Sequence, residues 1–225
     1  MGNDSPLVGI LTLPCNQDPN DCSGLNLTLP FEPISYVPAS YVKFLESGGA
    51  RVIPLLSDMS DDMITSVMSQ LNGILFTGGV ASFSNNNNNG TINWYWTQVT
   101  RIMEYLRKNK DIPLWGTCLG MEAMICATAM NGTSVMNLNL TANYMALALN
   151  FTSYAANNES RMLPSHLNAY TAYIYDTLST ENVTFNEHFY GFNPSVFVSD
   201  PYVRTNFTVL SYSSNPILED IQGSF

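Results

Sequence analysis

The sequence has few positive charges and few of the side chains that bind metals. Its 225 residues hold eight Lys and Arg against 18 Asp and Glu, which gives a formal net charge of −10. Nucleic-acid phosphates are bound by Lys and Arg, so this balance argues against a nucleic-acid partner. Only two histidines occur, His166 and His188, and there is no Cys-X-X-Cys pair, so we expect no metal site.

Long apolar runs are also missing. No stretch is long enough to span a bilayer, so no membrane partner is expected. Met1–Ser5 lacks the apolar core of a signal peptide, so a signal was either removed or never used. The chain nevertheless has nine Asn-X-Ser/Thr acceptors, about twice the number that chance gives in so Asn-rich a sequence. They favour a secreted, lysosomal or vacuolar glycoprotein over compositional bias, and they begin at Asn3, Asn26, Asn89, Asn131, Asn139, Asn150, Asn158, Asn182 and Asn206.

Cysteines are scarce as well, with four in the chain. Cys15 and Cys22 lie in a loop rich in Pro, Asn and Asp. The sequence allows two alternatives for them, a small disulfide or two free thiols. The five asparagines from Asn85 to Asn89 form a low-complexity run that we expect in a solvated loop.

Short apolar runs alternate with helical patterns through the first half of the chain. This alternation is typical of an α/β fold with a parallel sheet wrapped by helices and with ligands at the carboxyl ends of its strands. No linker or repeat divides the sequence, so we expect one domain over residues 1–225. The predicted strands are Leu7–Leu13, Val52–Leu56, Gly73–Gly79 and the run ending near Gly116. The predicted helices are Ala39–Ser47, a helix capped by Ser60 that runs to about Leu71, a helix that begins at Trp94 and carries Arg107, Lys108 and Lys110 in its last turn, and Met121–Met130.

Periodicity weakens in the last third of the chain. The predicted elements there are a strand over Ala146–Phe151, a helix within Arg161–Leu178, a helical stretch over Asn193–Asn206 that Pro201 interrupts, and a strand over Val209–Tyr212.

The segment Ile112–Glu122 carries the main chemical signal. An apolar run ends in Gly-Thr-Cys-Leu-Gly and a helical pattern follows at once, which is the strand–turn–helix geometry that holds a nucleophile on a sharp elbow. Gly116 and Gly120 remove the Cβ atoms that would clash there. The thiol of Cys118 would lie at the first turn of a helix, where backbone N–H groups and the helix dipole favour thiolate. A buried packing cysteine is the alternative, and the flanking glycines favour the nucleophile.

A second pair of glycines ends the strand before the elbow. Gly78 and Gly79 would offer a backbone N–H toward the same point as the amide of Leu119. Two convergent N–H groups form an oxyanion hole for a tetrahedral intermediate. An ordinary turn at the end of a strand is the alternative.

Three stretches together resemble the gamma-glutamyl hydrolase family. They read ASYVKFLESGGARVIP at 39–54, NGILFTGG at 72–79 and PLWGTCLGME at 113–122. The resemblance implies a class I glutamine amidotransferase-like cysteine peptidase, with a flavodoxin-like three-layer α/β sandwich around a mostly parallel central sheet. It implies hydrolysis of gamma-glutamyl bonds in folate poly-gamma-glutamates through a thioester, without a cofactor, by a homodimer.

The same resemblance implies roles for single residues. The nucleophile is Cys118, and the oxyanion is held by the N–H groups of Gly79 and Leu119. The residues expected beside the substrate are Glu122, His188 and Tyr36.

The sequence departs from this family in one respect. The catalytic His of the family lies in a Trp-His-Pro-Glu segment near the C-terminus, and the 225 residues hold no such segment. Three explanations stand: the sequence is truncated at its C-terminus, His188 substitutes, or the chain is a degenerate member that binds gamma-glutamyl ligands without cutting them. We favour truncation and expect weak activity, because losing a general base costs about 10² to 10⁴ in rate.

Overall fold

The computed structural model describes residues 4–15, 35–56, 58–83, 94–137, 139–157, 160, 168–214 and 221–222. The chain forms two compact units, Met1–Ala127 and Thr128–Phe225. The expectation that both belong to one domain stays a prediction.

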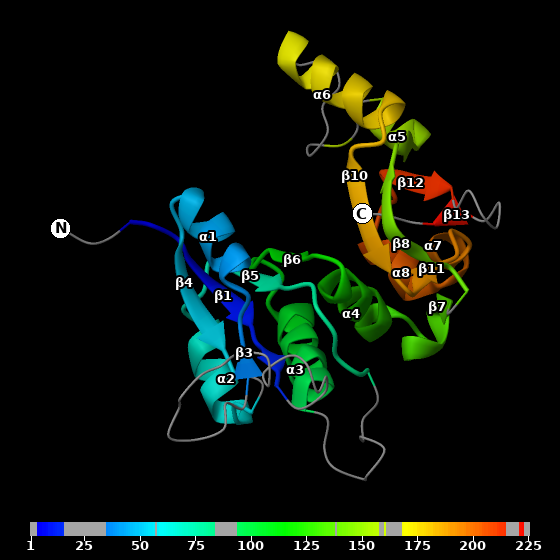
Figure 1. Cartoon of the computed structure of the whole chain (residues 1–225). Coiled ribbons are helices and arrows are strands. Elements are labelled where there is room, and N and C mark those ends of the chain that lie inside the picture. Colours follow the sequence, from blue (N-terminus) through cyan, green and yellow to red (C-terminus); the bar gives the residue numbers. More distant parts are fainter. Residues whose placement is uncertain are drawn as a thin grey trace. The chain divides into compact units, whose positions relative to one another are not determined.

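A parallel sheet of four strands forms the centre of the first unit (Figure 1). Its order is β4-β1-β5-β6, so the chain starts in the middle, steps to one edge and then builds toward the other. This arrangement confirms the predicted α/β fold, because it is the start of the flavodoxin-like strand order. The strands are β1 (Leu7–Leu11), β4 (Arg51–Leu55), β5 (Gly73–Phe76) and β6 (Leu114–Gly116).

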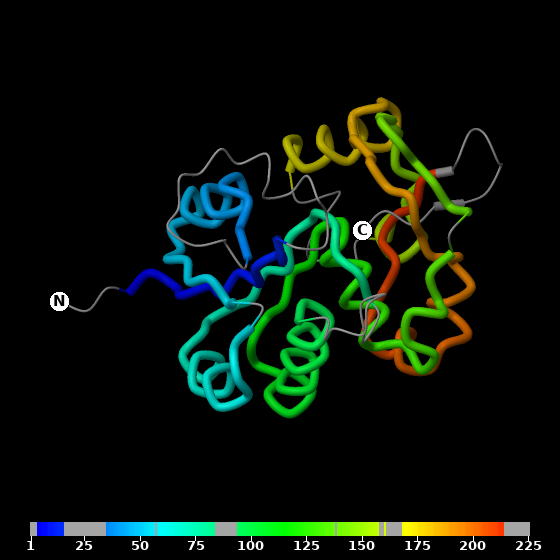
Figure 2. Tube along the Cα trace, turned by 60° about the horizontal axis from the view of Figure 1, so that its bottom comes forward, coloured from blue at the N-terminus to red at the C-terminus, as the bar shows by residue number. Residues whose placement is uncertain are grey.

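Helices cover both faces of this sheet (Figure 2). The connection from β1 to β4 runs in the opposite direction from the two that follow, so right-handed crossovers put its helix on the opposite face. Figure 2 shows α1 on one side of the strands and α2 and α3 on the other. The helices are α1 (Ala39–Ser47), α2 (Asp61–Met68), α3 (Trp94–Lys108) and α4 (Leu119–Thr128), and a short hairpin joins β2 (Leu13–Pro14) to β3 (Ser35–Tyr36).

Two helix ends follow the predicted capping chemistry. The Ser60 hydroxyl accepts the Met63 N–H at 3.4 Å and caps α2. Gly48 caps the end of α1, and Gly49 follows at φ 84°, a conformation that glycine adopts without strain.

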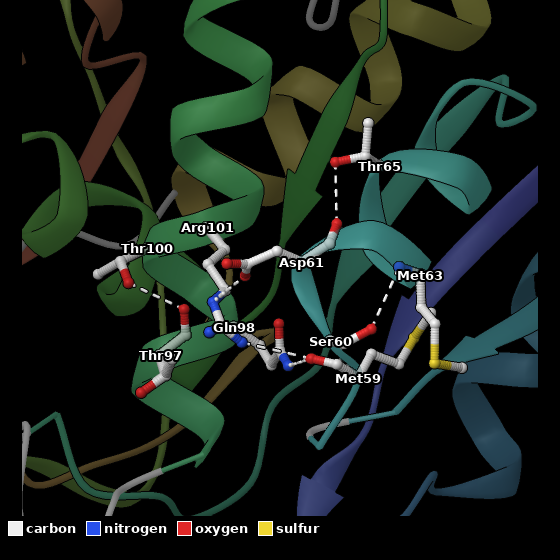
Figure 3. Close-up of polar contacts among 9 residues, drawn as sticks. All are labelled: Met59, Ser60, Asp61, Met63, Thr65, Thr97, Gln98, Thr100 and Arg101. Atoms are coloured by element: carbon white, nitrogen blue, oxygen red, sulfur yellow. Dashed lines mark hydrogen bonds and ion pairs between the residues drawn. The ribbon is translucent and has the colours of Figure 1, made fainter.

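A polar cluster ties α3 to the start of α2 (Figure 3). Gln98 is fully buried, and its side-chain amide donates to the Met59 carbonyl at 2.5 Å. Arg101 donates to the same carbonyl at 3.3 Å and pairs with Asp61 at 2.6 Å. The cluster supplies hydrogen bonds to the Met59 carbonyl, which precedes α2, and so fastens α2 to α3.

The second unit is built from small antiparallel sheets. β8 pairs with β10, β7 with β11, and β12 with both β9 and β13. The strands are β7 (Met136–Asn137), β8 (Ala142–Leu147), β9 (Asn150–Phe151), β10 (Thr184–His188), β11 (Gly191–Phe192), β12 (Ser211–Ser214) and β13 (Ile221–Gln222); the helices are η1 (Gly132–Val135), α5 (Ser153–Ala156), α6 (Ala169–Thr180), α7 (Val196–Ser199) and α8 (Pro201–Asn206).

The predictions for this unit are partly confirmed. The strand expected over Ala146–Phe151 is divided between β8 and β9. Pro201 does interrupt the helical stretch, but it also begins α8, because the first position of a helix needs no N–H donor. The Asp200 carboxylate caps that helix by accepting from Tyr202 and Val203 at 2.9 and 3.0 Å.

Several sequence predictions concern residues that the structure does not describe. Cys15 is disulfide-bonded, and Cys22, the candidate partner in the sequence, lies outside the described residues. His166 and the run Asn85–Asn89 lie outside them too. Among the helices of the described residues, none has the length and apolar character needed to cross a membrane.

Candidate active site

Cys118 lies on a sharp turn between β6 and α4. Its φ is 53°, in the left-handed region that non-glycine residues rarely adopt. Such a backbone costs about 1 to 3 kcal/mol and persists only where its surroundings hold it. The side chain is half-buried, so the thiol is not sealed in the core.

Backbone hydrogen bonds hold this turn on both sides. Thr117 donates its N–H to the Phe76 carbonyl at 3.1 Å, which extends the pairing of β6 with β5 to the residue before Cys118. Gly120 donates to the Thr117 carbonyl at 2.9 Å, and Glu122 donates to the Cys118 carbonyl at 3.1 Å. The last bond starts α4, so Cys118 occupies the residue before the first helical turn, as the sequence pattern predicts.

The glycines of the elbow are required by close packing. A Cβ on Gly116 would lie 2.7 Å from the backbone of Gly120, and a Cβ on Gly120 would lie 2.7 Å from the Phe76 Cβ and nearer still to its carbonyl. Contacts that short do not occur for real Cβ atoms, so a side chain at either position would push strand and helix apart.

Gly78 and Gly79 follow β5, the strand next to the elbow. Phe76 is in register with Gly116, so both strands end at the same edge of the sheet. A Cβ on Gly78 would lie 3.1 Å from the Cys118 Cβ, which places this glycine directly against the thiol-bearing residue. Gly79 has φ 142°, and a Cβ there would run into Leu13. The segment therefore needs glycine for both its conformation and its space.

Tyr36 reaches the same edge through the β2–β3 hairpin. It is the direct partner of Leu13, the residue that packs against Gly79. Through Leu13 it is connected to Gly79, and its role beside the substrate stays a prediction.

Glu122 is a buried carboxyl one turn into α4, only 6% exposed. Its charge acts on two neighbours. Burial raises the pKa of the Tyr95 phenol above its ordinary range, and Glu122 and Cys118 raise it further. Burial also raises the pKa of the Cys126 thiol to about 12, with a contribution from Glu122. Tyr95 and Cys126 are therefore neutral at physiological pH.

Sequence reasoning missed Tyr95 as a neighbour of the site. It lies at helical spacing with Val99 and Ile102, so the pattern indicates only a core residue. Its hydroxyl is buried and finds no hydrogen-bond partner among the described residues. The hydroxyl of Thr77, the residue before Gly78, is likewise buried without a partner there. Nothing in the sequence distinguishes such a phenol from one that simply packs.

His188 lies on β10 in the second unit, where it pairs with Ala142 of β8. Its side chain is half-buried and has an interaction partner. His188 belongs to the second unit and Cys118 to the first, and the role of His188 beside the substrate stays a prediction.

A parallel sheet covered by helices, with a strained cysteine on the sharp turn between a strand and a helix, places the chain among the α/β proteins with a strand–turn–helix elbow. Sequence comparison identifies the family. The model of the peptidase C26 family matches residues 7–187, and the chain belongs to this family.

Its relatives carry the name gamma-glutamyl hydrolase. The chain is 32% identical over 217 residues to gamma-glutamyl hydrolase B of Dictyostelium discoideum, covering 95% of this chain and 56% of that protein. It is 29% identical to gamma-glutamyl hydrolase of Rattus norvegicus, covering 95% of this chain and 61% of the relative. It is also 29% identical to gamma-glutamyl hydrolase 1 of Arabidopsis thaliana, covering 93% of this chain and 55% of that protein. The chain thus spans little more than half the length of the curated relatives it matches.

Proposed function

We propose that this protein hydrolyses gamma-glutamyl bonds with Cys118 as the nucleophile. The observation that carries the proposal is the backbone of Cys118, a non-glycine residue at φ 53° between a buried strand and a helix. The names of the relatives support the bond type, and the resemblance of the three sequence stretches supports folate poly-gamma-glutamates as substrates.

The reaction has two steps. The Cys118 sulfur attacks the carbonyl carbon of the gamma-linked amide, and the carbonyl oxygen takes the negative charge beside the N–H groups of Gly79 and Leu119. The C–N bond then breaks, the amine leaves with a proton, and a thioester remains on the sulfur. Water attacks this thioester through the same kind of intermediate and releases the carboxylate and the thiol. Glu122, Tyr36 and His188 are proposed to bind the substrate.

The 225 residues do not contain the family's segment with the histidine that serves as general base and general acid in this reaction. A thiol nucleophile of this type needs an imidazole that takes its proton and later protonates the leaving amine. The sequence offers His166 and His188, and neither matches the Trp-His-Pro-Glu segment of the family. We therefore expect a polypeptide of these residues to turn over about 10² to 10⁴ times more slowly than a family member that contains this segment. The alternative is a protein that binds gamma-glutamyl ligands and does not cut them.

We also propose a secreted, lysosomal or vacuolar glycoprotein. The acceptor asparagines that the structure describes are all exposed, as the attachment of a glycan requires: Asn131, Asn139, Asn150, Asn182 and Asn206. Asn3, Asn26, Asn89 and Asn158 lie outside the described residues. A homodimer is proposed from the family resemblance alone.

Trapping the acyl-enzyme tests the proposal. The protein is mixed with a folate oligo-gamma-glutamate, quenched in acid and measured by intact-protein mass spectrometry, while chromatography follows the released glutamate. We expect an adduct on Cys118, slow release of product, and loss of both in Cys118→Ala. Cys126→Ala is the matched control and should keep both. Binding of the substrate without adduct or release would support the non-hydrolytic alternative and refute the proposal.

A further inference from the structure

Tyr41 of α1 reaches the end of β5 with its hydroxyl. The Gly78 N–H donates to the Tyr41 oxygen at 3.0 Å, across 37 residues of sequence. The contact joins the helix on one face of the sheet to the strand end beside the nucleophile. It also occupies the Gly78 amide, which would otherwise be an unpaired donor after the last residue of β5.

The phenol oxygen and Cys118 approach the same point. A Cβ placed on Gly78 would lie 2.6 Å from the Tyr41 oxygen and 3.1 Å from the Cys118 Cβ. Both groups thus stand on the same side of Gly78, in the space that a side chain would fill in any other residue. A phenolic hydroxyl can accept through its oxygen and donate through its O–H, so the bond from Gly78 uses only its acceptor capacity.

The residue that Tyr41 holds directly precedes the proposed oxyanion donor. Gly79 has φ 142°, in a region that only glycine populates readily. The direction of the Gly79 N–H is set by the φ and ψ of Gly78, and glycine itself opposes rotation about these bonds only weakly. A fixed acceptor on the Gly78 N–H restrains the peptide plane before Gly78, so it removes one of the rotations that could turn the Gly79 N–H.

We propose that Tyr41 is a positioning residue for the oxyanion hole: by accepting the Gly78 N–H, it holds the Gly78–Gly79 segment so that the Gly79 N–H faces the carbonyl oxygen attacked by Cys118. The inference rests on the proposed function, because it assumes an oxyanion at this place. A purely structural role, in which Tyr41 only fastens α1 to β5, is the competing explanation.

Two reagents separate these roles without requiring turnover. Iodoacetamide alkylates the thiol by displacing iodide and creates no oxyanion, so its rate reports the thiolate alone. An aldehyde analogue of a gamma-glutamyl substrate adds the Cys118 sulfur to its carbonyl carbon, and the former carbonyl oxygen then takes the place of the oxyanion. Its dissociation constant reports the oxyanion hole.

Tyr41→Phe should weaken the aldehyde about tenfold, in line with losing one positioning hydrogen bond, and leave the alkylation rate of Cys118 unchanged. Tyr105→Phe, at another half-buried tyrosine of the same unit, is the matched control and should change neither. Unchanged aldehyde affinity in Tyr41→Phe overturns the inference, and so does an equal fall in both measurements, which indicates a disturbed elbow. A wild-type protein whose Cys118 alkylates but does not bind the aldehyde refutes the proposed function, and the inference with it.

Should Tyr41→Phe fail to fold, 3,5-difluorotyrosine at position 41 keeps the ring and the hydroxyl while weakening the oxygen as an acceptor. At pH 6 we expect a smaller loss of aldehyde affinity together with faster exchange of the Gly78 amide proton. Faster exchange without any loss of affinity would support the structural role and overturn the inference.

Discussion

The two free cysteines should differ sharply toward a thiol-directed reagent. Cys118 is half-buried at the start of α4, whereas Cys126 lies inside the same helix and is only 1% exposed. Burial raises the pKa of Cys126 to about 12, with Glu122 contributing. At pH 7.5 such a thiol holds about 10³-fold less thiolate than an ordinary cysteine, and the thiolate is the reactive form.

We therefore expect iodoacetamide to label Cys118 at least about 10³ times faster than Cys126 at pH 7.5. Labelling of Cys126 should rise about tenfold for each step of one pH unit between pH 6 and 9, because this whole range lies below its pKa. Peptide mapping assigns each label, and Cys118→Ser should remove the fast phase only. Slow labelling of both cysteines at similar rates would refute the view of Cys118 as an activated thiol and would favour the non-hydrolytic alternative.

Three further predictions concern stability and modification. Gly120→Ala should cost about 3 kcal/mol in denaturant unfolding, because its Cβ meets the backbone of β5, while Gly48→Ala, whose nearest neighbour is a carbonyl oxygen at 3.4 Å, should stay within about 0.5 kcal/mol. Asp200→Ala should cost about 1 to 2 kcal/mol. Burial raises the pKa of the Asp200 carboxyl, but backbone hydrogen bonds from Val203, Met130 and Tyr202 outweigh burial and lower this pKa below its ordinary value of 3.8. The contribution of Asp200 to the free energy of unfolding is therefore full above pH 3.8 and is lost as the pH falls through the lower pKa of the folded state. Expression through a eukaryotic secretory route should give a mass excess that peptide N-glycosidase removes, and an unmodified product would contradict the proposed location.

The first unit was largely predictable because its signals are local. The helix α1 has the bounds that the pattern gave, since an apolar face ends at two glycines. Buried parallel strands appear as continuous apolar runs, and both faces of this sheet are covered. The elbow was predictable for a similar reason, because the Gly-Thr-Cys-Leu-Gly spacing reflects a steric requirement that Phe76 and Gly120 impose on each other.

The second unit shows where such reasoning fails. β10 alternates polar and apolar residues irregularly, and its register shifts between Asn186 and His188. A short strand of this kind is stabilised by pairing with β8, and its own sequence pattern does not identify it. The paired residues are distant in sequence, since Thr184 pairs with Leu147, 37 residues earlier. The contact of Tyr41 with Gly78 was hidden for the same reason, because a helical tyrosine near a glycine stop gives no sign of what its hydroxyl reaches.

The contrast within α4 is the strongest physical argument for a reactive thiol. Cys126 shows what a cysteine does when it only packs: it lies in a regular helix, buried, with its pKa raised to about 12. Cys118, at the head of the same helix, has a left-handed backbone that costs about 1 to 3 kcal/mol and that glycine would adopt without strain. Packing does not require a cysteine there, because the side chain is only half-buried. Cys118 is strained, partly exposed, held by backbone hydrogen bonds on both sides and packed against Gly78. These features are better explained by the chemistry of its sulfur than by any contribution to the core.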